Sequence, residues 1–220
     1  MSRFLGPIHY WLFNKIQLHE KLEVDLVSHF EDKYGDEIGA FTQQMTQRFG
    51  SPIGDKPLEA LIDQGNIHGW LQERITIAET RHAAILTQIF DRYGQEAIND
   101  AISIYAEQGN RCGMDARDKE DVDNAMGLYK ALNNYILEGM PCDNVNNITT
   151  AEPDKLEWDI TRCLHRRYWD EVNANPEVFY GLRAAWVKAF IEGANSAYTY
   201  QVQPKSLRGE TIFTHQILKK

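Results

Sequence analysis

The chain has 220 residues, of which 43% are hydrophobic, and a formal net charge of −9. This hydrophobic fraction is ordinary for a globular protein and is enough to bury a sizeable core. The acidic balance argues against a nucleic-acid partner, because proteins that bind the phosphate backbone usually present a basic stripe. The densest basic spots are only two residues long, Arg166-Arg167 and Lys219-Lys220.

Cysteine usage and hydropathy point to a cytoplasmic protein. The three cysteines, Cys112, Cys142 and Cys163, are too few and too widely spaced for a disulfide framework or a structural zinc site. The start of the sequence lacks the apolar run of a signal peptide, and no stretch approaches the 18 apolar residues of a membrane span. We therefore expect no membrane partner. The abundant Trp, Tyr and Phe residues could line a pocket, so we expect a small-molecule ligand. The chain could form a homodimer, and the sequence does not indicate which cofactor, if any, it uses.

Helical spacing of apolar residues dominates the chain up to about Gly139. Residues 7–34 and 68–93 are predicted to form long helices, and they end at Tyr34-Gly35 and Tyr93-Gly94. The shared ending fits an internal duplication, and it fits equally well two amphipathic helices with the same stop signal. Shorter helices are predicted over residues 36–49, 56–64, 95–108 and 118–138, with Gly109–Gly113 breaking or kinking the path.

A two-residue alternation replaces the helical spacing after Pro141. Leu156, Trp158 and Ile160 alternate with polar residues, which is typical of a strand with one buried face. Further strands are predicted near residues 145–150, 198–202 and 211–218, with a helix over 176–192. Short turns between strands favour antiparallel pairing.

These elements together predict an α+β fold. The N-terminal two-thirds is expected to be mostly helical and to pack on a small antiparallel sheet formed by the C-terminal third. We divide the chain into a helical region, residues 1–94, and an α+β region, residues 95–220, and we expect the two to form one compact unit.

Glu79-x-x-His82 is the first candidate for a functional motif. Residues at i and i+3 share one face of a helix, and carboxylate-bridged di-iron bundles combine two such motifs with two further carboxylates. This chain has one clean copy. Glu79 and His82 are therefore candidate metal ligands, and the alternative is an ordinary surface pair. His82 is also a candidate base, because imidazole titrates near neutral pH.

Cys163 is the second candidate, at the end of the strand predicted over residues 156–163. Arg162 and His165 flank it, and positive neighbours increase the thiolate fraction of a cysteine. This is the setting of a nucleophile, with His165 or His82 as the base. The alternative is a buried, inert cysteine.

The third candidate is Gly109-x-x-x-Gly113-x-x-Ala116, whose small residues would let a backbone or a ligand approach closely. Arg111 and Asp115 lie within it and could orient a polar small molecule. A guanidinium suits a substrate carboxylate, so Arg111 or Arg162 could hold one. Packing between helices is the alternative.

Four short motifs together resemble a known family. They are GNRCGMDA at residues 109–116, WDITRC at 158–163, EGAN at 192–195 and SLRGE at 206–210. Over about residues 95 to 218 the chain resembles the L-2-amino-thiazoline-4-carboxylic acid hydrolase-like family. More distantly, it is similar to the small-molecule-binding domains named after vinyl reductase. The resemblance implies hydrolysis of a small cyclic C–N or C–S compound, with Cys163 where the family carries a cysteine at the end of a strand.

The chain departs from this family at three positions. Leu164 stands where the family has a proline, and Trp186 and Phe213 stand near its second and third cysteines. The loss of two thiols removes a thiolate cluster that could hold a metal, and Trp186 becomes a candidate substrate contact. Two other functions stay open: a non-enzymatic protein that binds a small molecule or metal at a helical Glu/His site, and a helical partner-binding protein with an exposed apolar patch.

Overall fold

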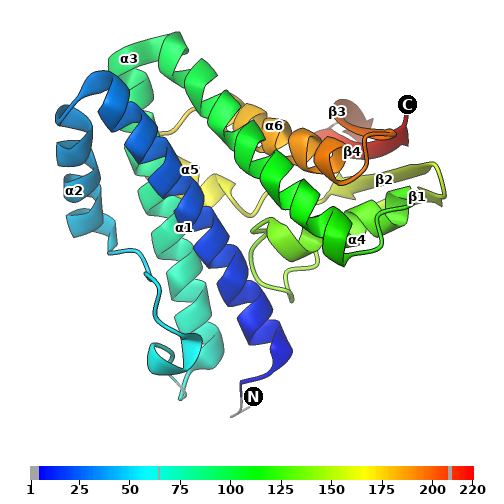
Figure 1. Ribbon diagram of the computed structural model, residues 1–220, viewed down its shortest axis with the longest axis horizontal. Coiled ribbons are helices and arrows are strands. Elements are labelled where there is room, and N and C mark those ends of the chain that lie inside the picture. The colour runs from blue at the N-terminus through cyan, green and yellow to red at the C-terminus, as the bar shows by residue number, and fades with distance from the viewer. Residues whose placement is uncertain (1–4, 64, 208–209) are drawn as a thin grey trace. The chain divides into compact units, whose positions relative to one another are not determined.

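The computed structural model describes residues 5–63, 65–207 and 210–220. None of the helices described is long and apolar enough to cross a membrane. The helices are α1 (Pro7–Tyr34), α2 (Glu37–Phe49), the 3-10 helix η1 (Leu58–Ala60), α3 (Ile67–Lys119), α4 (Ala125–Tyr135), α5 (Arg166–Glu171) and α6 (Pro176–Ala194), as Figure 1 shows. The strands are β1 (Asn146–Glu152), β2 (Lys155–Ile160), β3 (Tyr198–Leu207) and β4 (Glu210–Lys219).

The predicted α+β fold class is confirmed. Four strands form a sheet in the order β1-β2-β4-β3, and every neighbouring pair is antiparallel. The chain divides into two compact units, each assembled from separate segments. The first runs to Asp100 and adds Ile136–Met140 and His165–Pro176, whereas the division predicted from sequence falls after residue 94. The second contains Ala101–Tyr135, Pro141–Leu164 and Glu177–Lys220.

In the first unit α1 lies beside the first part of α3, and the two helices run parallel (Figure 1). Near their starts the rings of Phe13 and Trp70 stack with centroids 6.4 Å apart. Near the end of α1 the rings of Tyr34 and Tyr93 stack at 3.8 Å, with an interplanar angle of 2°. Because the partner numbers rise together along both helices, this pairing fixes their common direction.

Both Tyr-Gly endings have the same backbone cause. Gly35 has φ 83° and ψ −162°, and Gly94 has φ 68° and ψ −148°. Positive φ is a region that glycine enters far more readily than other residues, so each helix stops or turns there. The end predicted at residue 93 is confirmed as a turn within α3, because helical structure resumes after Gly94 and continues to Lys119.

The break predicted at Gly109–Gly113 is wrong, since α3 stays helical through it. A Cβ atom on Gly109 would lie 2.2 Å from the carbonyl oxygen of Trp186, and one on Gly113 would lie 2.2 Å from that of Phe190. These glycines therefore let the second part of α3 touch the backbone of α6. The alternative of packing between helices is confirmed.

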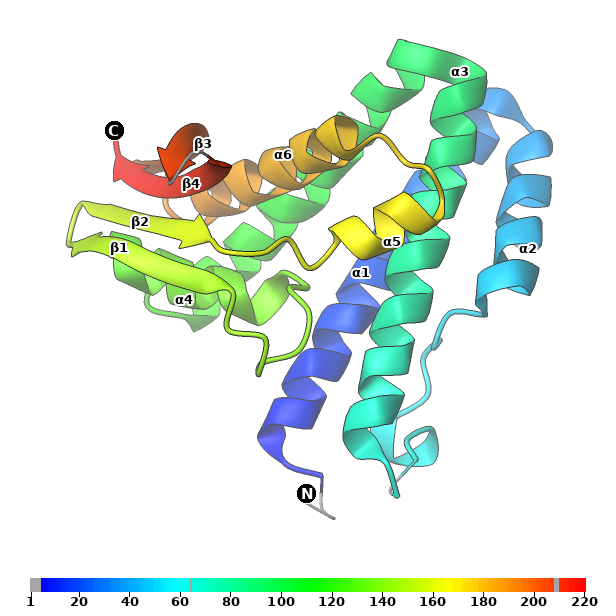
Figure 2. The ribbon, with the colours of Figure 1, turned by 180° about the vertical axis from the view of Figure 1, so that it is seen from behind.

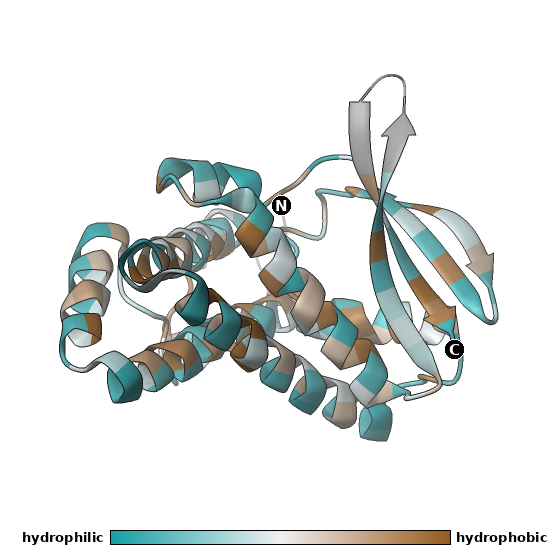
Figure 3. Ribbon diagram, turned by 90° about the horizontal axis from the view of Figure 1, so that it is seen from above, coloured by the Kyte–Doolittle hydropathy of each residue, from teal (hydrophilic) through white to brown (hydrophobic). Residues whose placement is uncertain are grey.

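The sheet belongs to the second unit and is covered by α4, which contacts β1, β2 and β4. Leu156 and Trp158 of β2 are buried, as their alternation predicted, and Figure 3 shows apolar and polar residues alternating along the strands. Trp158 stands opposite His215 of β4, with ring centroids 5.2 Å apart. It also contacts Tyr129 of α4 at 5.0 Å between ring centroids.

Two predicted helices are shorter than expected, and one helix was not predicted. The helix predicted over residues 56–64 is only the 3-10 turn η1, preceded by Pro57 with an extended backbone. The helix predicted over 118–138 is limited to α4, because α3 occupies the chain up to Lys119. The unpredicted helix is α5, whose six residues are too few to establish a period.

Candidate functional site

Besides His9, seven charged or imidazole side chains among the described residues lie in the interior of the first unit, each with 6% or less of its surface exposed. Charged groups are rarely buried so completely unless they are paired, because their removal from water is expensive. We call this set the buried polar cluster. Its members are Lys15, Glu20 and Glu23 of α1, Glu79, Arg81 and His82 of α3, and His165 at the start of α5.

Helical spacing explains why these groups point inward. Glu20 and Glu23 follow the buried Ile16 at i+4 and i+7, and these positions share one face of a helix. Glu79 and His82 follow the buried Ile75 in the same way, at i+4 and i+7. The charged positions of α1 on its apolar face were therefore visible in the sequence, although Glu20 and Glu23 were not predicted as part of a site.

Arg81 is fully buried and links three segments. Its Nε donates to Glu23 Oε1 at 2.8 Å, its Nη2 donates to Glu20 Oε1 at 3.2 Å, and its Nη1 donates to the carbonyl oxygen of Gly50 at 3.0 Å. The second oxygen of Glu20 accepts from the backbone N–H of Ile53 at 2.9 Å. The guanidinium thus holds α1, α3 and the loop after α2 together. We call these contacts the Arg81 clamp.

His82 lies beside the Arg81 clamp, with Nδ1 at 4.0 Å from Glu23 Oε2 and its ring centroid 4.6 Å from that of His19. Burial lowers the pKa of His82 well below its ordinary value, and His19 and Arg81 act in the same direction against Glu79. Burial also raises the pKa of Glu23, which Arg81 opposes. His82 is therefore a neutral imidazole at neutral pH. Because Glu79 and His82 are both buried, the alternative of a surface pair is wrong.

His165 is held between two carboxylates and an indole. Its Nδ1 lies 3.0 Å from Glu79 Oε1, and its Nε2 lies 3.6 Å from Glu138 Oε2. The ring stacks on that of Trp169, with centroids 5.7 Å apart and an angle of 18°. An ionised carboxylate only accepts hydrogen bonds, so an ionised Glu79 places the hydrogen on Nδ1 and leaves Nε2 for proton transfer. We call Glu79 and His165 the dyad.

The dyad connects distant parts of the sequence within the first unit. Figure 2 shows α5 beside the first part of α3, where Gln72 Nε2 donates to the hydroxyl of Tyr168 at 3.3 Å. Glu138 and Trp169, which also lie beside His165, were not predicted from sequence. Glu138 lies in the segment after α4 and belongs to no motif, so no local signal could have identified it.

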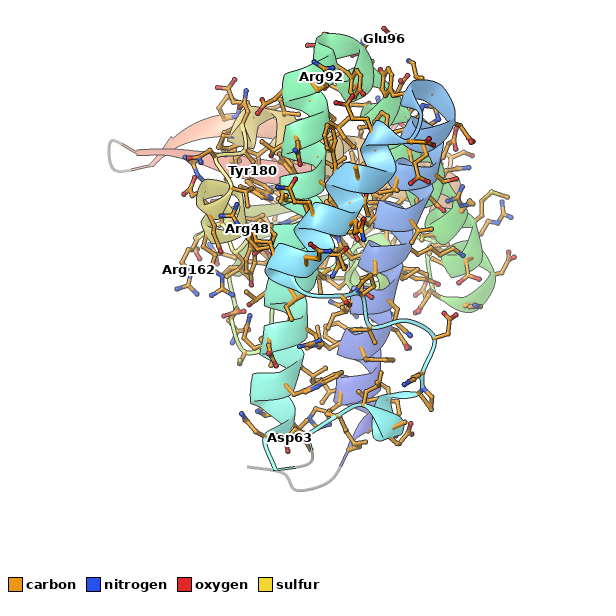
Figure 4. The ribbon with its side chains drawn as sticks, turned by 90° about the vertical axis from the view of Figure 1, so that its left-hand side faces the viewer. Arg48, Asp63, Arg92, Glu96, Arg162 and Tyr180 are labelled. Carbon is orange, nitrogen blue, oxygen red and sulfur yellow. The ribbon has the colours of Figure 1, made fainter. Side chains whose placement is uncertain are left out.

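Cys163 and Arg162 lie in the second unit, beyond the end of β2 at Ile160. The strand predicted to reach Cys163 therefore ends three residues earlier. Cys163 is a free, half-buried thiol, so it is not the sealed cysteine of the alternative. The side chain of Arg162 is 69% exposed, with Nη2 at 3.7 Å from Asp143 Oδ1, and it points outward in Figure 4.

The other predicted substrate contacts also belong to the second unit. Asp115 accepts from Lys119 Nζ at 2.9 Å, and this hydrogen bond lowers the pKa of Asp115. Trp186 is buried and donates from Nε1 to Gln108 Oε1 at 2.9 Å. Arg111 is exposed on α3. The roles of these three residues in substrate binding stay predictions.

A metal centre is not assigned. Among residues 5–63, 65–207 and 210–220, no group of three or more His, Cys, Asp or Glu side chains is arranged to hold a metal ion. Glu79 directs one oxygen at His165, and with His82 it would supply only two donors. The pairing of Glu79 and His82 around a metal stays a prediction.

Comparisons with known proteins identify no family. No protein-family model matches the chain, and neither does any curated protein. A solved structure from a study of heme distortion in the H-NOX family is similar over 91% of this chain and 94% of that chain, with 10% identity and a TM-score of 0.36. The resemblance drawn from the four motifs stays a prediction, and Arg208 and Gly209 of its last motif lie outside the described residues.

Proposed function

We propose that the chain is a hydrolase of small cyclic C–N or C–S compounds in which His165 is the general base. The observation that carries this proposal is the 3.0 Å contact between His165 Nδ1 and Glu79 Oε1 in the interior of the first unit. The substrate class comes from the resemblance of residues 95 to 218 to the amino-thiazoline-carboxylate hydrolase-like family.

The dyad supports this role through orientation and charge. The carboxylate of Glu79 fixes the tautomer of the imidazole and stabilises the imidazolium that forms when the base takes a proton. The indole of Trp169 fixes the plane of the ring. A base that is already oriented needs little rearrangement when the reaction begins.

The proposed reaction balances with water as the co-reactant. Nε2 of His165 removes a proton from the attacking water, whose oxygen bonds to the ring carbon of the substrate. The carbon–nitrogen or carbon–sulfur bond breaks, and the imidazolium returns the proton to the leaving atom.

The test is hydrolysis of 2-amino-thiazoline-4-carboxylate by the wild-type chain and by matched histidine variants. His165→Asn should lower kcat by about 10²- to 10⁴-fold, the usual contribution of a positioned acid–base group. His29→Asn is the control, because His29 Nε2 also faces a carboxylate, Asp100 Oδ2, at 3.5 Å but its side chain is 43% exposed. The control should retain wild-type turnover.

Three outcomes would contradict parts of the proposal. A wild-type chain that binds the compound without turning it over would be a binding protein. Equal turnover by His165→Asn and the wild type would remove the dyad from the mechanism. Unchanged turnover by Cys163→Ala would exclude the thiol as the nucleophile and leave water as the attacking group.

A further inference from the structure

His165 lies between two carboxylates, and the three side chains form a row that runs from the interior toward the surface. Glu79 lies on its Nδ1 side and Glu138 on its Nε2 side. The side chains of Glu79, His165 and Glu138 are 4%, 5% and 20% exposed. The row therefore begins at a fully buried carboxylate and ends at one that water can reach.

The atoms of this row favour a shared proton or a bridging water between His165 Nε2 and the Glu138 carboxylate. With its hydrogen on Nδ1, a neutral ring presents a lone pair at Nε2, and a lone pair beside an ionised carboxylate is repulsive. A proton on Nε2, a proton on the Glu138 carboxyl, or a bridging water that donates to both removes this repulsion. The 3.6 Å separation is longer than a hydrogen bond, but one bridging water or a small carboxyl rotation can close it.

The other charged groups near His165 have partners of their own. On its own helix, Arg166 donates to Asp170 at 2.6 Å, and Arg167 donates to the hydroxyl of Tyr168. On α3, His82 stands one turn from Glu79 and is neutral because it is buried. Among the described contacts, the charges that face the ring of His165 from neighbouring segments are thus the two carboxylates.

We propose that Glu138 passes protons between His165 Nε2 and solvent. The proposal deepens the proposed function and rests on it, since it gives the base a route for restoring its proton state between turnovers. Glu138 acts through His165 and needs no contact with the substrate. When His165 loses its proton, the proton moves from Nε2 to a carboxylate oxygen of Glu138 and from there to water. When His165 regains a proton, the same transfers run in reverse.

The test follows, by NMR in chain labelled with ¹⁵N-histidine, the rate at which His165 Nε2 exchanges a proton with water, with the signal assigned from His165→Asn. Glu138→Gln should slow exchange of this proton with water by about 10²-fold or more, because the positioned proton acceptor is gone. Glu138→Asp keeps a carboxylate and should retain exchange within about tenfold of the wild type. Asp100→Asn is the control, because it removes the carboxylate beside His29 and should leave the His165 signal unchanged.

Equal exchange rates in folded Glu138→Gln and wild type would overturn the proposal, since a Glu138 with a merely structural role changes stability and not this rate. If Glu138→Gln does not fold, exchange in Glu138→Asp decides, and a loss of 10²-fold or more there would equally overturn the proposal. The measurement uses no substrate. Absence of hydrolysis by the wild type would therefore contradict the proposed function. Unchanged proton exchange in Glu138→Gln would contradict only the role of Glu138.

Discussion

The two compact units stabilise their interiors in different ways, although α3 contributes to both. In the first unit α3 presents Arg81, whose guanidinium is paired with two buried carboxylates. In the second unit the same helix presents Gly109 and Gly113, which bring its backbone against that of α6. The first interior depends on the balance of charge, and the second depends on the absence of side-chain volume. Loss of a charge should therefore be most damaging in the first unit, and added side-chain volume should be most damaging where α3 meets α6 in the second.

The largest effect is expected from Arg81→Met. The change keeps much of the side-chain volume but leaves Glu20 and Glu23 buried without their counter-charge, which should lower the free energy of unfolding by about 3–5 kcal/mol. Urea denaturation followed by circular dichroism measures it. Arg92→Met is the control, because the side chain of Arg92 is 62% exposed beside Glu37 and should contribute about 1 kcal/mol or less.

A combined variant sharpens the same comparison. If charge balance is the cause, replacing Glu20 and Glu23 by Leu together with Arg81→Met should restore much of the lost stability, because buried ion networks can often be exchanged for apolar residues. Equal losses for Arg81→Met and Arg92→Met would contradict the importance of the Arg81 clamp.

A smaller effect is expected from Gly113→Ala in the second unit. The added Cβ would lie 2.2 Å from the carbonyl oxygen of Phe190, so α3 and α6 must separate, and stability should fall by about 1–3 kcal/mol. Gly181→Ala in α6 is the matched control, because its Cβ would meet no heavy atom within 4 Å. The control should stabilise the helix by about 0.5–1 kcal/mol. Stabilisation by both changes would refute the close approach.

The smallest effect is a pH dependence from His82. Burial lowers its pKa below the ordinary value of 6.5, so the unfolded chain takes up a proton below that pH before the folded chain does. Stability should therefore fall as the pH drops below 6.5, by at most about 1.4 kcal/mol per pH unit from this group. Unfolding free energies at pH 7.5 and 5.5 measure the loss.

His82→Gln should flatten this dependence, whereas His29→Gln, which changes an exposed histidine, should keep it. The raised pKa of Glu23 acts in the opposite direction, because its folded form holds a proton more readily than the unfolded form. Glu23 is present in the wild type, in His82→Gln and in His29→Gln, so its contribution cancels when their pH dependences are compared. Parallel curves for the wild type and His82→Gln would show that His82 does not titrate as proposed.

Periodicity predicted the fold where one face of an element is buried along its whole length. The bounds of α1 agree with the predicted residues 7–34, and the alternation around Leu156 and Trp158 located β2. Periodicity failed where an element is short or where a residue is placed by its packing against a distant helix. The six residues of α5 carry no period, and Gly109 and Gly113 lie in mid-helix because α6 packs on them.

The candidate site was predicted residue by residue but not as an arrangement. Glu79, His82 and His165 were each selected for the chemistry of their side chains. The contact between Glu79 and His165 joins positions 86 residues apart, and no local pattern indicates which distant residue a buried carboxylate will meet. Glu20 and Glu23 interrupt an apolar stripe, which is the one signal that could have identified the Arg81 clamp beforehand.

The Arg81 clamp also bears on the order of folding. The three hydrogen bonds that Arg81 donates join residues 58, 31 and 61 positions apart, so each must wait until a long loop has closed. Until then the guanidinium and its carboxylates keep their hydration, since stripping one ion of water before its partner arrives is unfavourable. Dehydration of this core and completion of its ion pairs should therefore coincide, as one late, cooperative event on the folding pathway.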